Sequence, residues 1–189
     1  MYNQNNDGRV DSANNEKITS YLRQNNLYAK IPSIREWYDL LIHSNNDDIY
    51  CPINIKLSNL IGNDNLNCKL GIYFALTGSI PNFSNEINWS KFLIKLYNDI
   101  KENERDYYFL IINKKNIKDI YYNSLKRIKE FISNGNNLPF QCDWNKNKIK
   151  TSRSFEESKQ IIMKSFFKSA KNRAKLYFEF CDIFKDIEG

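Results

Sequence analysis

The sequence has few of the residues that many catalytic and metal-binding sites require. It contains one histidine, His43, so a catalytic triad would have to use this residue, and no nucleophile turn lies near it. The four cysteines are far apart, and no pair has the spacing of a zinc-binding or redox motif. The six glycines form neither a phosphate-binding nor a dinucleotide-binding loop. These absences argue against zinc hydrolases, P-loop enzymes and dinucleotide-dependent enzymes.

Long apolar segments are absent as well. The longest uninterrupted apolar run, Tyr107–Ile112, has six residues, whereas a membrane-spanning helix needs about 20. Residues 1–17 are polar and lack the apolar stretch of a signal peptide. We therefore expect a cytoplasmic protein without a membrane partner. In a reducing cytosol the cysteines, which have apolar neighbours, are expected to be buried free thiols: Cys51, Cys68, Cys142 and Cys181.

The apolar content is sufficient for one folded domain. Hydrophobic residues make up 41% of the 189 residues and aromatic residues 14%, enough to form a core without disulfides or metals. The chain has neither an internal repeat nor a linker, and we expect a single domain over residues 1–189. The order of expected helices and strands predicts an α/β fold, with a mixed β-sheet flanked by helices and a long C-terminal helix.

The expected elements follow from hydrophobic periodicity and from capping and turn residues. Helices are expected over residues 13–24, from Asp64 to about residue 77, over 89–101, over 120–132, and from a capping box of Ser154 and Glu157 to about residue 187. Strands are expected over 34–43, 49–58 and 106–114, with residues 44–48 as the turn of a hairpin. Residues 134–148 are expected to form a polar loop in which Trp144 belongs to the core.

Positive charge is concentrated in one segment. The whole chain has a formal net charge of +6, and residues 145–175 carry ten basic residues against two acidic ones, a net charge of +8. Within this segment, four lysines spaced four, three and four residues apart share one face of the expected final helix: Lys164, Lys168, Lys171 and Lys175. This lysine face is either a solvated helix surface or a contact surface for phosphate groups.

The expected hairpin brings polar residues of two segments together. Asp39 precedes an apolar run on the first strand, and Asn54 and Lys56 alternate with apolar residues on the second. If the strands pair about the turn, Asp39 approaches Asn54 and Lys56. A carboxylate and the main-chain carbonyl of Ile55 are suitable ligands for Mg²⁺, and a nearby lysine can orient a water molecule or offset charge at a phosphodiester. Alternatively, Asp39 is a solvated carboxylate and Lys56 protects a sheet edge.

The frame D-L-L-I, followed by a turn and P-I-N-I-K-L-S, resembles the core of PD-(D/E)xK nucleases, which include type II restriction endonucleases. The downstream segments DNLNCKLGIYFALTG and DYYFLIINK are similar to the helix and buried strand of that family, so the resemblance covers residues 13–114. It implies a restriction-endonuclease-like core. Residues 115–189 are not covered by the resemblance, and we expect them to form a helical and loop region with elements for DNA binding and dimer formation.

By this resemblance, Asp39 is the metal-binding aspartate and Lys56 the catalytic lysine. Asn54 stands where the family usually has aspartate or glutamate, and a neutral amide binds Mg²⁺ more weakly and cannot act as a base. A second carboxylate is therefore expected, either Glu16 on the first helix or Glu36. The expected metal ligands are Asp39, Glu16 and the carbonyl of Ile55.

Further residues are candidates for contact with DNA. Asparagine and glutamine side chains can bind adenine edges, and lysine or arginine can bind guanine or phosphate. In a chain with 28 asparagines, a polar loop without such a role is the alternative. The candidates outside the lysine face are Lys69, Asn136, Asn137, Gln141, Lys146, Lys148 and Arg153.

The sequence therefore predicts a Mg²⁺-dependent type II restriction endonuclease that cleaves double-stranded DNA at a short specific site. A palindromic site would call for a homodimer with two-fold symmetry. Three alternatives remain open: a non-catalytic nucleic-acid-binding protein with a degenerate nuclease core, a nuclease of the repair or resolvase type, and an interaction protein whose final helix packs against a partner.

Overall fold

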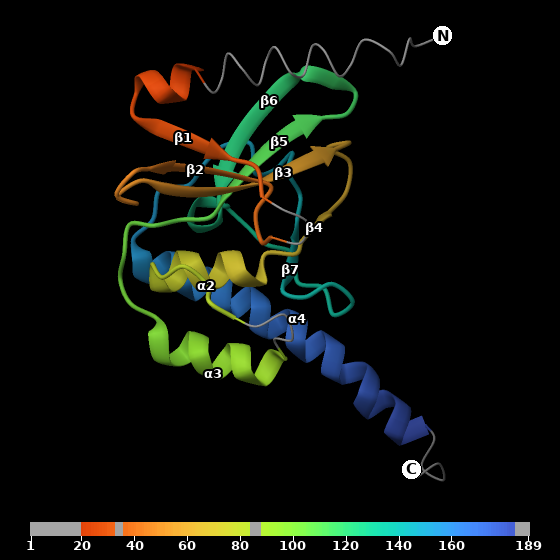
Figure 1. Cartoon of the computed structure of the whole chain (residues 1–189). Helices are drawn as coiled ribbons and strands as arrows, with labels where there is room; N and C mark the ends of the chain where they lie inside the picture. Colours follow the sequence, from red (N-terminus) through yellow and green to blue (C-terminus); the bar gives the residue numbers. More distant parts are fainter. Residues whose placement is uncertain (1–19, 33–35, 84–87, 184–189) are drawn as a thin grey trace.

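A mixed five-stranded sheet forms the centre of the structure, a computed structural model that describes residues 20–32, 36–83 and 88–183. Its strands follow the order β1-β2-β3-β5-β6 (Figure 1). Their bounds are Leu27–Lys30, Leu40–Ser44, Tyr50–Ser58, Tyr108–Asn113 and Asn116–Ser124. β3 and β5 are parallel, and every other neighbouring pair in this sheet is antiparallel. The predicted α/β fold with a mixed sheet is confirmed.

The parallel pairing of β3 and β5 requires a crossover connection, since the chain must return to the end at which β3 began. Helices α2 (Lys69–Thr77) and α3 (Trp89–Asp99) lie in this connection. A long helix, α4 (Phe155–Ile183), packs on the same side of the sheet as α2 (Figure 1). α2 ends at Gly78, whose φ of 67° is the left-handed conformation that favours glycine at a helix end.

β2 and β3 form the predicted hairpin. Leu40 pairs with Ile53, and the turn is closed by Ser44, whose Oγ accepts a hydrogen bond from the N–H of Ile49 at 3.0 Å. Residues 36–39 lie within the strand expected over residues 34–43, but they do not form a strand. The reason is that Trp37 packs its ring against the core, where it stacks on an aromatic ring at a centroid distance of 5.7 Å.

Asp64 does not cap a helix, contrary to the sequence prediction. It begins β4 (Asp64–Leu66), which pairs antiparallel with β7 (Phe140–Cys142) in a second sheet of two strands. Leu66 is fully buried, so this pairing places an apolar side chain in the core before the helix starts. The predicted helix is confirmed only from Lys69 onward.

The predicted helix over residues 120–132 is wrong. Residues up to Ser124 belong to β6, and only one 3-10 turn, η1 (Leu125–Arg127), follows. Exposure along β6 alternates, because Ile120 and Tyr122 are exposed whereas the residues next to them turn inward. This is the period of a strand, and pairing with β5 stabilises it. Of the predicted first helix, residues 20–24 are helical and the remainder lies outside the described residues.

The core lies between the sheet and helices α2 and α4. It contains Trp144, which is 1% exposed, as the sequence predicts. All four cysteines are free thiols. Cys68 and Cys142 are buried and Cys51 is partly buried. Cys181 is exposed, contrary to expectation, because its part of α4 extends beyond the body of the protein (Figure 1).

α4 begins with the predicted capping box. The Oγ of Ser154 accepts a hydrogen bond from the N–H of Glu157 at 3.3 Å, and Glu157 Oε2 accepts one from the N–H of Ser154 at 2.8 Å. These hydrogen bonds with Ser154 lower the pKa of the Glu157 carboxyl. The described part of α4 ends at Ile183. None of the described helices combines the length and apolar content of a transmembrane span.

Candidate active site

Asp39 lies where one edge of β3 becomes free of its neighbour. The pairing of β2 with β3 ends at Leu40 and Ile53, and the N–H of Asp39 donates to the carbonyl of Ile53 at 2.8 Å. Further along this edge, the carboxylate of Asp39 binds β3 in place of a strand. Its Oδ2 accepts hydrogen bonds from Asn54 Nδ2 at 2.8 Å and from the N–H of Ile55 at 2.7 Å. The side chain of Asp39 thus replaces strand pairing while it remains exposed to solvent.

The carbonyl of Ile55 faces the same edge. In a β-strand, the N–H and C=O groups of one residue point to the same side, and the N–H of Ile55 points to Asp39. The two predicted oxygen ligands from this hairpin, the carboxylate of Asp39 and the carbonyl of Ile55, therefore lie along one edge of β3.

Lys56 lies on the same face of β3 as Asn54, two residues further along the strand. Its Nζ donates a hydrogen bond to the carbonyl of Asn65 at 3.1 Å. An ammonium group has three N–H donors, so this contact leaves donors for a water molecule or a phosphate. Burial raises the pKa of the neighbouring Cys68 thiol to about 12, and the positive charge of Lys56 opposes this rise.

A chain of hydrogen-bonded side-chain amides begins at Asn65, whose carbonyl binds Lys56, and reaches β7. Asn65 Oδ1 accepts a hydrogen bond from Gln141 Nε2 at 2.6 Å, and Gln141 Oε1 accepts one from Asn134 Nδ2 at 2.9 Å. Both ends of the Gln141 amide are thus used within the protein. These contacts compete with the predicted contact between Gln141 and a base.

Two buried side-chain oxygens have no hydrogen-bond partner among the described residues. They are Asn54 Oδ1, on β3, and Asp64 Oδ2, on β4. Buried polar atoms are nearly always paired, so an unpaired acceptor marks a position where a donor or a cation can bind. Sequence reasoning assigned Asp64 to a helix cap and did not consider it for the site, since no local pattern signals a short strand there.

Of the two carboxylates predicted to complete the site, one can be located in the part of the chain that the structure describes. Glu16 lies outside the described residues. Glu36 is exposed, three residues before Asp39. Over residues 20–32, 36–83 and 88–183, no three histidine, cysteine, aspartate or glutamate residues are grouped to hold a metal ion.

Three of the predicted DNA-binding cations have partners within the protein. Lys146 forms an ion pair of 3.4 Å with Glu130, and Lys148 forms one of 2.9 Å with Asp119. The guanidinium of Arg153 donates to the carbonyls of Ile128 and Lys129 at 2.6 and 2.7 Å. These side chains therefore have structural contacts that a role in DNA binding would have to replace or share.

The remaining predicted DNA contacts differ in their exposure. Within the described residues, Lys164, Lys168 and Lys171 are exposed and have no ion pair, whereas Lys175 is 3.1 Å from Glu179. Lys69 lies at the start of α2 with its Nζ 4.3 Å from the ring centroid of Trp89. Asn136 is exposed and Asn137 is partly buried, in the loop that precedes β7.

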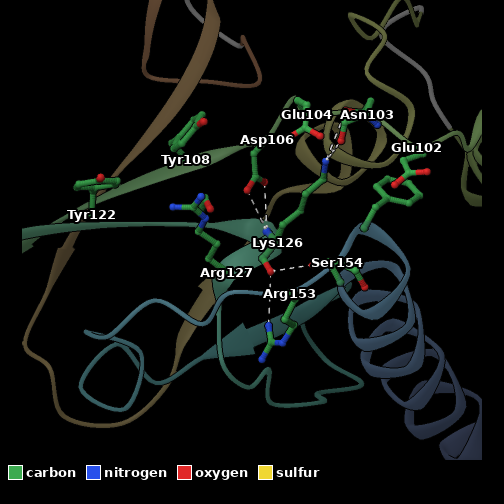
Figure 2. A pocket seen from close by; sticks show the side chains of 13 residues that line it. Glu102, Asn103, Glu104, Asp106, Tyr108, Tyr122, Lys126, Arg127, Arg153 and Ser154 are labelled. Atoms are coloured by element: carbon green, nitrogen blue, oxygen red, sulfur yellow. Dashed lines mark hydrogen bonds between the residues drawn. The ribbon is translucent and has the colours of Figure 1, made fainter.

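A separate cavity of about 400 Å³ lies where β5 begins, β6 ends and α4 begins (Figure 2). Asp106 faces this cavity, although only 7% of the residue is exposed, and its Oδ1 accepts hydrogen bonds from the N–H groups of Tyr107 at 2.8 Å and Lys126 at 3.2 Å. Burial raises the pKa of this carboxyl to about 6. The lining of the cavity includes neither Asp39 nor Asn54, so it is distinct from the hairpin site.

Neither a protein-family model nor a curated protein matches this sequence. The hairpin site consists of one carboxylate directly before β2, and of one amide with an unpaired oxygen and one lysine on the same face of β3.

Proposed function

We propose that this chain is a Mg²⁺-dependent endonuclease that hydrolyses phosphodiester bonds of double-stranded DNA, as a type II restriction endonuclease does at a short specific site. The observation that carries the proposal is the contact between Asp39 Oδ2 and Asn54 Nδ2 at 2.8 Å, with Lys56 on the same face of β3 as Asn54. This supports the resemblance to PD-(D/E)xK nucleases, because the hairpin joins the residues that the resemblance assigns to catalysis.

The topology around the hairpin also supports the proposal. The resemblance implies a hairpin, a helix and a buried strand in this order, and β2, β3, α2 and β5 occur in that order, with β4 before α2 and α3 after it. β5 pairs parallel with β3, and its residue Ile111 is fully buried next to Lys56 in the register of the two strands. A rigid neighbour on this side holds Lys56 in place, as a catalytic group requires.

The oxygen atoms at this edge fit Mg²⁺. Asp39 offers a carboxylate, Asn54 Oδ1 is a buried acceptor without a partner among the described residues, and the Ile55 carbonyl faces the same edge. Mg²⁺ is usually held by one or two carboxylates and keeps water and phosphate ligands, so a complete cage of protein ligands is not required. When bound, the ion would polarise a phosphoryl oxygen and supply an activated water molecule.

The roles of the side chains follow from their chemistry. Lys56 would orient the attacking water molecule or offset negative charge at the phosphodiester, with its Nζ held by the carbonyl of Asn65. Asn54 cannot accept a proton at neutral pH, so it would position Asp39 and contribute Oδ1 rather than act as a base. Glu16 is the proposed second carboxylate.

The DNA-binding surface would include the lysine face of α4, since three of its four lysines have no ion pair among the described residues. Cleavage of both strands at a palindromic site would involve a homodimer with two-fold symmetry. Phosphate contacts of lysine make binding dependent on salt concentration, because counterions are released from DNA.

The test is cleavage of plasmid and genomic DNA of varied sequence in the presence of Mg²⁺ or Mn²⁺. We expect discrete products from the wild type, a large loss of cleavage for Lys56→Ala, and unchanged cleavage for the matched control Lys118→Ala, since Lys118 is exposed on β6. No cleavage by the wild type, or equal cleavage by Lys56→Ala and the wild type, would overturn the proposal.

A second candidate function is a non-catalytic nucleic-acid-binding protein. It is favoured by one observation, namely that an amide, Asn54, contacts Asp39 at the position where the family usually has a second acid. Such a protein would bind DNA without metal in a salt-dependent manner and give no products. A nuclease of the repair or resolvase type would instead cleave branched or damaged DNA when such DNA replaces the plasmid in this assay.

A further inference from the structure

The cavity beside Asp106 lies apart from the hairpin site, and the proposed function gives it no role (Figure 2). Its volume of about 400 Å³ is within the range of roughly 300–1,000 Å³ that is usual for small-molecule and cofactor sites. Empty cavities in proteins are typically apolar, whereas this one is lined by charged, hydroxyl and aromatic side chains. These side chains indicate the chemistry of a ligand that fits it.

Two of the lining side chains are polar and buried. Ser124 is 2% exposed, and its Oγ makes no hydrogen bond within the described residues. The second is Asp106: burial raises the pKa of its carboxyl, and the nearby Ser124 hydroxyl opposes this rise. Buried polar atoms nearly always have a partner, so the Ser124 hydroxyl marks a position where a polar atom of a ligand can bind.

Arg127 supplies the cavity with a cation whose donors are available. It is exposed, and among the described residues its side chain forms neither an ion pair nor a hydrogen bond. The two other cations of the lining have contacts within the protein, because Arg153 donates to main-chain carbonyls and Lys126 Nζ donates to the carbonyl of Asn103 at 2.7 Å. A guanidinium is a planar group of N–H donors that matches the oxygens of a phosphate. Arg127 is therefore suited to an anionic group of a ligand.

Two tyrosines lie beside Arg127 (Figure 2). Burial raises the pKa of Tyr108 to about 12, and the charge of Arg127 opposes this rise. The pKa of Tyr122 is lowered first by Lys150, whose Nζ lies 3.1 Å from the ring centroid, and also by Arg127. Tyr122 is 52% exposed, so part of its ring surface is accessible to a ligand. Tyrosine rings next to cations are a surface on which a planar heterocycle stacks.

We propose that this cavity binds a mononucleotide, with the phosphate on Arg127 and the base against Tyr108 and Tyr122. The polar edge of the base binds the buried groups, Ser124 Oγ and the carboxyl of Asp106. A hydroxyl both donates and accepts hydrogen bonds and a carboxylate accepts them, which suits the donors and acceptors along a base edge. Stacking of an unpaired base on aromatic side chains, combined with hydrogen bonds to its edge, is how proteins recognise single nucleotides.

Other ligands use fewer of these groups. A free inorganic anion would contact Arg127 and leave the tyrosine rings and Ser124 Oγ without a partner, and an apolar ligand would leave the polar groups unpaired. The acidic residues of the lining, Glu102 and Glu104, are exposed and lie on the opposite side of Asp106 from Arg127 (Figure 2), so the anion-binding side keeps its positive charge. The inference does not depend on the proposed nuclease activity.

The first test titrates the full chain calorimetrically with nucleoside 5′-monophosphates, with the corresponding nucleosides and with inorganic phosphate. Divalent cations are left out, so that a metal at the hairpin site does not contribute. We expect the dissociation constant of at least one nucleotide to be roughly tenfold or more below those of its nucleoside and of phosphate. Absence of nucleotide binding at millimolar concentration overturns the proposal. Equal affinity for nucleotide and inorganic phosphate also overturns it, because the base would then make no contact.

The second test locates the phosphate. Arg127→Ala should raise the dissociation constant of the nucleotide roughly tenfold and leave that of the nucleoside unchanged, because the lost contact is to the phosphate. The matched control is Lys129→Ala, which removes an exposed cation two residues further along the chain and outside the lining. It should leave both constants unchanged. Equal effects of Arg127→Ala and Lys129→Ala on nucleotide binding overturn the proposal.

The third test locates the base. Tyr122→Leu should weaken binding of nucleotide and nucleoside by the same factor, roughly tenfold, since the lost contact is stacking on the base. Ser124→Ala removes a hydroxyl that has no hydrogen bond within the described residues, so it should weaken nucleotide binding without lowering the thermal midpoint of the protein. Nucleotide affinity that neither variant changes overturns the proposal. Lys56→Ala should bind the nucleotide as the wild type does, so failure of the nuclease proposal and failure of this one give different results.

Discussion

The carboxylate of Asp39 accepts a hydrogen bond from Asn54 Nδ2 at 2.8 Å. An amide at this position satisfies the carboxylate without a metal ion, because it offers N–H donors where an aspartate would bring a second negative charge. The amide oxygen, Asn54 Oδ1, is left buried and without a partner among the described residues. The contact is therefore stable as it stands and still presents an acceptor to a cation.

Replacing this amide by a carboxylate should make the stability of the protein depend on Mg²⁺. Asn54→Asp places two carboxylates within hydrogen-bond distance, and their repulsion should lower the free energy of unfolding by about 1–3 kcal/mol when divalent cations are removed. Mg²⁺ should restore the loss, because a ligand that binds the native state stabilises it. Thermal unfolding with a chelator and with Mg²⁺ measures both effects.

The matched control for this prediction is Asn116→Asp. Asn116 is exposed at the start of β6, and its Oδ1 accepts a hydrogen bond from the N–H of Lys118 at 3.2 Å, which an aspartate can also accept. This variant adds the same charge away from Asp39. An equal response of both variants to Mg²⁺ would contradict a cation site at Asn54.

Gly71→Ala should destabilise the packing of α2 against β5. A Cβ atom at position 71 would lie 2.5 Å from Cδ1 of Tyr107. The ring of Tyr107 cannot withdraw easily, because its hydroxyl donates to the carbonyl of Trp37 at 2.7 Å and its ring stacks on Trp37. Overpacking of this kind costs about 1–3 kcal/mol, which should exceed the gain in helix propensity. A thermal midpoint at or above that of the wild type would contradict the prediction.

The parts of the fold that depend on neighbouring residues could be predicted from the sequence. The hairpin turn is closed by Ser44, and the start of α4 by Ser154 and Glu157, so local side-chain chemistry was sufficient in both places. β1 has only four residues and pairs with β2 through tertiary contacts, and no local pattern predicts it. Likewise β6 has apolar residues that fit a helix or a strand, and pairing with β5 decides between them.

The candidate site likewise combines contacts that follow from local sequence with contacts that depend on tertiary pairing. Asp39 directly precedes β2 and Asn54 lies on β3 of the same hairpin, so the turn and the alternation along β3 were enough to predict that they meet. The contact between Asn65 and Gln141 joins residues 76 positions apart, and it depends on the pairing of two short strands. Sequence patterns did not indicate this contact, and Gln141 was therefore predicted to bind a DNA base.

Asn147 illustrates why composition alone could not assign roles to asparagines. It is fully buried; its Oδ1 accepts a hydrogen bond from the N–H of Lys129 at 2.8 Å, and its Nδ2 donates to the carbonyl of Asp143 at 2.8 Å. Asn147→Ala leaves these main-chain groups without partners and should cost about 2–4 kcal/mol of unfolding free energy. Asn145→Ala, at an exposed position of the same loop, should change it by less than about 0.5 kcal/mol. Urea denaturation of both variants tests the difference, and equal losses would contradict it.

Protonation of the buried carboxyl of Asp106 should raise the free energy of unfolding in mild acid. Burial raises its pKa in the folded state to about 6, whereas an aspartate in an unfolded chain has a pKa of about 3.9. Between these two values the folded state binds a proton that the unfolded state does not. Stability from this group therefore rises as the pH falls from about 7 to about 4, by about 3 kcal/mol in total.

Asp106→Asn removes this titration while it keeps a side-chain oxygen that can accept from the N–H groups of Tyr107 and Lys126. Other groups titrate in the same range, so the informative quantity is the difference in unfolding free energy between wild type and variant at each pH. That difference should shift in favour of the wild type as the pH falls through about 6, because only the wild type gains a proton on folding there. A difference that stays constant from about pH 7 to about pH 4 would show that Asp106 ionises in the folded protein as it does in the unfolded chain.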